Sequence, residues 1–120
     1  FTVPLWAEKR QAPALRAAKA DREAARARHL AAARTASAQY STYNATRRAA
    51  EESIAVLEQK IDAIADQVAA QLTTYESGIG DYSPIIDGEI AVIALRAKIA
   101  LEQSRRDSAI ARMNALLVTS

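Results

Sequence analysis

The sequence predicts an all-α protein, a long antiparallel helical hairpin of the coiled-coil type. Three observations predict this fold class. Alanine makes up about a quarter of the 120 residues, and Arg, Glu, Gln and Leu are abundant, so intrinsic helix propensity is high. Two of the three glycines and one of the three prolines fall within residues 75–84. Apolar residues before that stretch follow alternating steps of three and four.

Residues 1–6 carry the only β character of the chain, because they combine β-branched and aromatic residues with a proline. We expect a short extended segment here. It is either a loosely packed tail or the end of a strand whose partners lie outside the chain. Phe1 in place of Met suggests that the sequence starts inside a longer protein or after processing.

A first helix is expected from about residue 12 or 13 to residue 76, with Pro13 tolerated in its first turn. At 1.5 Å per residue it would be roughly 95 Å long. Its second half carries a coiled-coil seam with Gln71 in one slot and Leu72 beside it. The apolar members of this seam are Ile54, Leu57, Ile61, Ile64, Val68 and Tyr75.

The first half of this helix keeps the same phase, but its seam residues are small, aromatic or charged. They are Ala33, Ala36, Tyr40, Tyr43, Arg47 and Ala50. Further alanines lie on more than one face, which predicts more than one helical neighbour for this part.

A turn over residues 77–83 separates the two helices, because Gly78 and Gly80 accept positive φ without a Cβ penalty. Ser83 is the expected N-cap, with Pro84 at the first position of a second helix that ends near residue 117. This helix carries two apolar stripes. One contains Ile86, Ile90, Ile93, Ala97 and Ala100, and the other contains Ile99, Ile110, Met113 and Leu117.

The second helix covers only the lower half of the first. The upper half, from about Ala14 to Tyr43, therefore either finds partners in other chains or folds back near residues 41–44.

No catalytic or metal-binding constellation is found, so we expect no enzyme activity, cofactor or metal. The chain has no cysteine and a single histidine, His29, which has no ligand-spaced partner. Asp62 and Asp66 share a helix face, but without a second base they are interpreted as surface charges. No apolar run reaches the length of a transmembrane helix, and no signal segment opens the chain.

Charge divides the chain into a basic and an acidic half. Residues 1–50 hold ten Lys/Arg and three Asp/Glu, whereas residues 51–120 hold six and eleven. The basic residues spread around the helix without a recognition motif, so a solvated face is preferred to nucleic-acid binding. The acidic residues at the turn serve either as caps and solubilising groups or as an electronegative tip. They are Glu76, Asp81, Asp87 and Glu89.

In order and spacing the chain resembles one repeat of the outer membrane efflux proteins, the TolC family. The features that carry the resemblance are Val3-Pro4-Leu5-Trp6, the long Ala/Arg-rich helix, Tyr75-Glu76-Ser77-Gly78, the link to Ile86-Asp87, and the ending Arg112-Met113-Asn114-Ala115-Leu116-Leu117. The opening and the ending are most similar to the heavy-metal branch, with its CusC-like and CzcC-like proteins. Gly80-Asp81, Pro84 and Gly88 depart from the family pattern.

The resemblance implies a homotrimeric channel with a β-barrel in the outer membrane and an α-helical periplasmic tunnel. The whole chain, residues 1–120, would be a single helical-hairpin fragment, assigned by the resemblance to the second repeat, with the strand exit at 1–6 and the periplasmic tip at 77–83. By this likeness Tyr75, Gly78, Asp81 and Asp87 belong to the tip that gates the tunnel. The implied partners are further copies of the chain, a periplasmic adaptor and an RND-type inner-membrane pump.

The alternative function is a soluble coiled-coil interaction module, such as the helical hairpin of a periplasmic adaptor, which also reverses at a short loop. Flanking sequence distinguishes the two classes, because a channel continues into a second strand-helix repeat while an adaptor hairpin is flanked by β-rich segments. The exported substrate is not predicted, since specificity in such systems lies largely in the pump.

Overall fold

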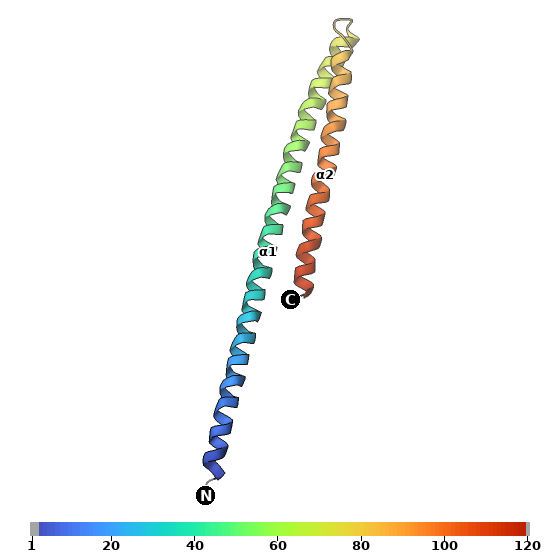
Figure 1. Cartoon of the computed structure of the whole chain (residues 1–120). Helices are drawn as coiled ribbons and strands as arrows, with labels where there is room; N and C mark the ends of the chain where they lie inside the picture. The colour runs from blue at the N-terminus through green and yellow to red at the C-terminus, as the bar shows by residue number, and fades with distance from the viewer. Residues whose placement is uncertain (1–2, 120) are drawn as a thin grey trace. The chain divides into compact units, whose positions relative to one another are not determined.

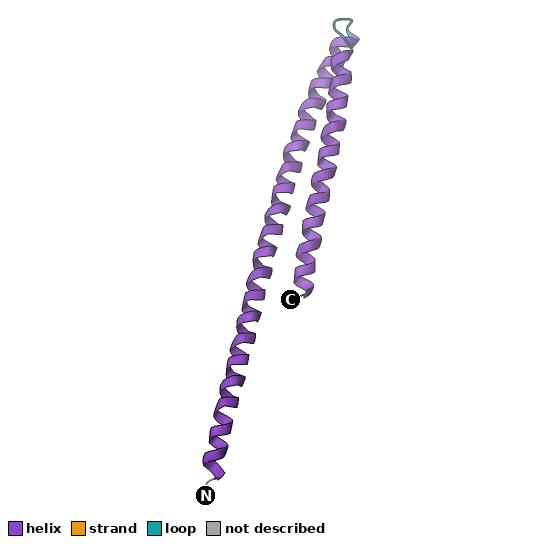
Figure 2. Cartoon of the chain, in the orientation of Figure 1, coloured by secondary structure: helices purple, strands orange, loops and turns teal. Residues whose placement is uncertain are grey.

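The computed structural model describes residues 3–119, and side chains are described for residues 12–118. These residues form two helices and, within this range, no strand: α1, Val3–Glu76, and α2, Ser83–Thr119 (Figure 2). The predicted all-α hairpin of two long helices is confirmed. By their contacts, residues up to Gln39 and residues Tyr40–Thr119 make two separate units, which are described in turn.

The extended N-terminal segment predicted for residues 1–6 is wrong where it can be checked. Residues 3–6 are helical, and α1 continues through Pro13, which lies inside the helix and not in its first turn. Residues 1 and 2 lie outside the described residues. Residues 3–119 contain no strand with which Val3 and Trp6 could pair, whereas a helix satisfies its backbone hydrogen bonds locally.

In the first unit, residues 12–39 of α1 form a helical segment whose described side chains are almost all exposed. Ala36 is the exception and is half-buried. Leu15 and Leu30 are 67% and 51% exposed. The helix therefore rests here on alanine-rich propensity and backbone hydrogen bonds, and buries little apolar surface.

In the second unit, residues 40–76 of α1 lie antiparallel beside α2 (Figure 1). Three contacts fix the register along the pair. The Tyr75 and Tyr82 rings meet at the turn, Gly88 lies against Val68, and the Arg112 guanidinium lies 5.6 Å from the centre of the Tyr43 ring. From pair to pair, the residue number decreases on α1 by nearly as much as it increases on α2. Two antiparallel helices in one continuous register require this.

The predicted seam of α1 is the face that meets α2. Ile54 is buried, and Leu57, Ile61, Ile64 and Val68 are half-buried in alternating steps of three and four. Gln71 occupies the next seam slot and is also half-buried, while its neighbour Leu72 is 39% exposed. The polar residue therefore takes the seam position because the heptad phase, and not hydrophobicity, decides which residue points inward.

On α2 the seam follows the same steps and starts at Ile85, which is only 2% exposed. Its other buried or half-buried members are Gly88, Val92, Leu95, Ile99, Glu102, Arg106, Ala109, Met113 and Leu116. The second predicted stripe thus joins the seam through Ile99 and Met113, but Leu117 is 62% exposed.

At Gly88 the backbone of α2 lies close against a side chain of α1. A Cβ atom at this position would overlap Cγ2 of Val68 and would lie 3.7 Å from Cγ2 of Ile64. Glycine therefore lets the Val68 side chain sit directly on the backbone of α2. This close packing gives a physical reason for a residue that weakens helix propensity by about 1 kcal/mol relative to alanine.

Further from the turn the seam becomes small and charged. Ala50 and Ala109 are buried, at 0% and 3% exposure. In the register of the two helices, Arg106 lies opposite Ala50, and Arg47 lies opposite Ala109. Arg47 bonds to Asn44 and forms an ion pair with Glu51, at 2.8 Å, on its own helix. The Arg47 and Arg106 side chains are both partly exposed, as expected for arginines whose stems pack while their charged groups stay near water.

Candidate functional site

The turn between the helices is the predicted tip, and it begins with a Schellman motif at the end of α1. The Ile79 N–H donates to the Thr74 carbonyl at 3.2 Å, and the Gly78 N–H donates to the Tyr75 carbonyl at 3.0 Å. Gly78 has φ of 83°, the left-handed conformation that this motif needs. The helix therefore ends here for a backbone reason, as the glycine predicts.

The start of α2 differs from the expected cap by one residue. The N–H groups of Ile85 and Ile86 donate to the Tyr82 carbonyl at 3.0 and 3.3 Å, so Tyr82, and not Ser83, is the N-cap residue. Pro84 is then the second helical position. The Asp81 carboxylate accepts the Ser83 N–H at 3.4 Å, and thereby bonds one of the donors left open at the helix start. The sequence rule selected the hydroxyl beside the proline, but the aspartate two residues upstream does the capping.

An aromatic pair joins the two helix ends across the turn. The rings of Tyr75 and Tyr82 lie 5.1 Å apart, centre to centre, at an interplanar angle of 60°, which is an edge-to-face contact. Both rings remain partly accessible, at 45% and 42% exposure. Tyr75, predicted as a tip residue, thus has a defined partner that the sequence analysis did not name. The sequence feature that could have predicted this contact is the position of the two tyrosines, seven residues apart on either side of the glycines of the turn.

Apolar and acidic groups share the surface of the turn. Ile79, between the two glycines, is 72% exposed. The partly exposed Tyr75 and Tyr82 precede and follow it within four residues in the sequence. Asp87, the fourth predicted tip residue, is exposed and lies one turn into α2, away from Gly78 and Asp81. The structure therefore places Gly78 and Asp81 in the turn itself, Tyr75 in the last helical turn of α1, and Asp87 on α2.

The first predicted stripe of α2 forms a second apolar face that α1 does not cover. Ile86, Ile90 and Ile93 are 45%, 58% and 66% exposed, and Ala97 and Ala100 continue the same steps of four and three. At 100° per residue this stripe lies roughly 150° around the helix from the seam. We call these five residues the outer stripe. α2 is thus apolar on two nearly opposite faces.

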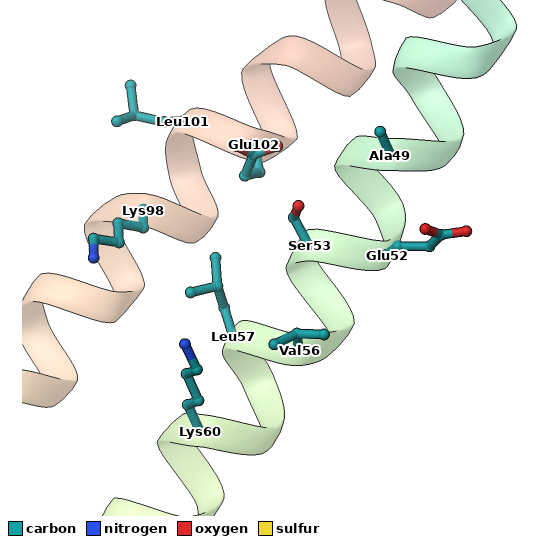
Figure 3. Close-up of a pocket in the computed structure, with 9 residues that line it drawn as sticks. All are labelled: Ala49, Glu52, Ser53, Val56, Leu57, Lys60, Lys98, Leu101 and Glu102. Atoms are coloured by element: carbon teal, nitrogen blue, oxygen red, sulfur yellow. The ribbon is translucent and has the colours of Figure 1, made fainter.

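A shallow groove of about 620 Å³ runs between the two helices of the second unit (Figure 3). Leu57, Val56 and Leu101 contribute its apolar lining, and Lys60 and Lys98 border one end. Glu52 and Glu102 lie toward the other end. The groove is open to solvent, and Ser53 also lines it; its mixture of apolar and charged side chains suits the packing of a further side chain or helix.

The residues considered for catalysis or metal binding stay apart. His29, Asp62 and Asp66 are all exposed, and among residues 12–118 no group of three potential metal ligands gathers. The basic side chains of residues 12–39 are likewise exposed. In the described part of the chain, neither helix has a stretch long and apolar enough to cross a lipid bilayer.

No family model, curated protein sequence or solved structure matches this chain. The fold and its turn therefore define the class of protein by themselves. It is a long two-helix hairpin with coiled-coil packing, closed by a two-glycine turn.

Proposed function

We propose that this hairpin is a wall element of a periplasmic duct, part of the tunnel of a trimeric outer membrane efflux channel of the TolC type. In this function the chain works with a periplasmic adaptor and an inner-membrane pump, and the mechanism is conduction and gating. Helices near the turn shift relative to one another to open an aperture, and no bond is made or broken.

The observation that carries the proposal is the two-faced character of α2. One apolar face is used by α1, and the outer stripe on the far side exposes three isoleucines. A helix in the wall of a tube has a neighbour on each side, so it needs two apolar faces. A hairpin that stands alone in water needs only one.

The alanine-rich segment of residues 12–39 supports the same function. Its described side chains are mostly small and exposed, so helices of other segments or subunits can approach its backbone closely. Because an isolated alanine-rich helix of this length is marginal in water, neighbours of this kind supply the stabilisation that the chain itself does not.

The second candidate is the helical hairpin of a periplasmic adaptor. The observation that favours it is the exposed apolar group at the turn, Tyr75, Ile79 and Tyr82, which is a suitable contact surface at the end of an interaction module. Flanking sequence separates the two functions. A second strand-helix repeat and barrel strands in the full gene support the channel, whereas β-rich flanks on both sides support the adaptor.

The gating role of the turn is tested in the full-length protein reconstituted in planar bilayers. We expect Tyr75→Ala to raise the open probability, because it deletes the ring that contacts Tyr82 across the turn. Tyr75→Phe retains the ring pair and serves as the matched control, and Tyr40→Ala removes a tyrosine far from the turn in sequence. Conductance and open probability unchanged in Tyr75→Ala would contradict the gating role.

A further inference from the structure

We propose that the outer stripe binds a second copy of this chain, with the two α2 helices antiparallel about a two-fold axis near Ile93. The inference concerns the 120-residue chain by itself and does not rest on the proposed channel. In that channel a neighbouring wall helix would cover the same stripe, so the two-copy association belongs to the chain outside such an assembly.

The outer stripe has the form of a second coiled-coil seam. Its five residues, from Ile86 to Ala100, follow steps of four, three, four and three, and its isoleucines are about half to two-thirds exposed. It lies on the far side of α2 from α1, so another helix can lie along it without disturbing the hairpin. Removing these isoleucines from water is the driving force for association.

The order of large and small residues in the stripe favours an antiparallel partner. Isoleucine occupies the first three positions and alanine the last two. When two copies run antiparallel through Ile93, Ile86 faces Ala100 and Ile90 faces Ala97, so a large side chain meets a small one at each of these levels. A parallel arrangement would set isoleucine against isoleucine at one end and alanine against alanine at the other.

The charges that flank the stripe follow the same order. Asp87 and Glu89 lie at its beginning, and Arg96 and Lys98 lie in its second half. None of the four enters an ion pair among residues 12–118, where the three ion pairs involve other residues. An antiparallel copy brings Glu89 to Arg96, and Asp87 to Lys98, on both sides of the axis. A parallel copy would align like charges.

Size and charge therefore specify the same arrangement independently. Because each copy presents the same surface to the other, the interface is isologous and closes at two copies. The expected species is a dimer of hairpins whose α2 helices form the central pair.

The first experiment measures association of the 120-residue chain by sedimentation equilibrium. We expect a dimer, and we expect Ile93→Asp to weaken association more than tenfold, because it places two carboxylates together at the axis. Leu30→Asp is the matched control, since it adds the same residue at an exposed leucine of the other unit. Circular dichroism verifies that both variants remain helical. A wild-type chain that is monomeric at millimolar concentration overturns the proposal.

The second experiment tests orientation, and the absence of native cysteine makes it free of background. Ile93→Cys should cross-link to itself on mild oxidation, whereas Ile86→Cys should not. A mixture of Ile86→Cys and Ala100→Cys chains should form the mixed disulfide. Self-linking of Ile86→Cys as fast as that of Ile93→Cys would indicate a parallel pair and would refute the arrangement.

The third experiment exchanges charges. Glu89→Arg should weaken dimerisation roughly threefold to tenfold, as expected for exposed ion pairs that occur twice in the interface. Adding Arg96→Glu to the same chain should restore it. If the double variant is no tighter than the single variant, the pairing is wrong. Failure of these tests leaves the channel proposal standing, because flanking sequence and conductance decide that function separately.

Discussion

Alanine at position 88 should change the stability of the hairpin in opposite directions, depending on the residue at position 68. In the wild-type chain the new Cβ would overlap Cγ2 of Val68, closer than the 3.0 Å below which real Cβ atoms are essentially never found. Valine in a helix has one strongly preferred rotamer, so this methyl group cannot easily turn away. The helices must separate near the turn to accommodate it.

Two opposing effects set the size of the change. Overpacking of a close contact costs about 1–3 kcal/mol. Replacing glycine by alanine inside a helix contributes about 1 kcal/mol of stability through helix propensity. Gly88→Ala should therefore destabilise the wild-type hairpin by up to about 2 kcal/mol. In a Val68→Ala chain the overlapping methyl group is gone, so the same substitution should stabilise by up to about 1 kcal/mol.

The assay is native-state hydrogen exchange of the amides in residues 61–99, which reports opening of the hairpin separately from residues 12–39. Urea unfolding of the same four chains of the double-mutant cycle gives a second measure, and the coupling energy should be about 1–3 kcal/mol. Val56→Ala is the control background, because Val56 is 50% exposed and should leave Gly88→Ala destabilising. The same sign of effect in the Val68→Ala and Val56→Ala backgrounds would refute the close-packing explanation.

Three further substitutions test the seam, the turn and the aromatic pair by chemical unfolding. Ile85→Ala should lower the free energy of unfolding by about 2–4 kcal/mol, because this side chain is 2% exposed. Ile86→Ala should change the stability of the single hairpin little, and equal effects of the two substitutions would contradict the assigned register. Gly78→Ala should lower the free energy of unfolding by about 1–2 kcal/mol, because φ is 83° while no atom lies within 4 Å of the added methyl group. Gly78→Asn should lower it less, and a neutral Gly78→Ala would argue against the Schellman turn. Tyr82→Ala should lower the free energy of unfolding by about 0.5–1.5 kcal/mol more than the loss of buried apolar area explains, because it removes the ring contact with Tyr75. Tyr82→Phe should leave the urea midpoint almost unchanged. If it were as damaging as Tyr82→Ala, the hydroxyl and not the ring contact would matter.

The turn illustrates how local chemistry made part of this site predictable. Gly78 ends α1 through its own conformational freedom, and no distant residue is needed to explain it. The cap of α2 was less predictable, because Asp81, Tyr82 and Ser83 compete for the same role. Backbone geometry within three residues decided that Tyr82 starts the helix and that Asp81 bonds to the Ser83 N–H.

The N-terminal residues show the opposite case. Their β-branched and aromatic character predicted an extended segment, yet residues 3–6 are helical in this chain. Strand propensity depends on a neighbouring strand, and the described part of the chain offers none. Helix propensity acts within a single segment and needs no partner.

The sequence by itself determined the two helices, the position of their reversal and the α1 seam, because periodicity and glycine conformation act locally. Only the tertiary structure decided which of the two stripes of α2 faces α1. Both have coiled-coil spacing, and the contact of Gly88 with Val68 selects the seam that begins at Ile85. That choice leaves Ile86, Ile90 and Ile93 on the outside, and the surface for a further helix follows from it.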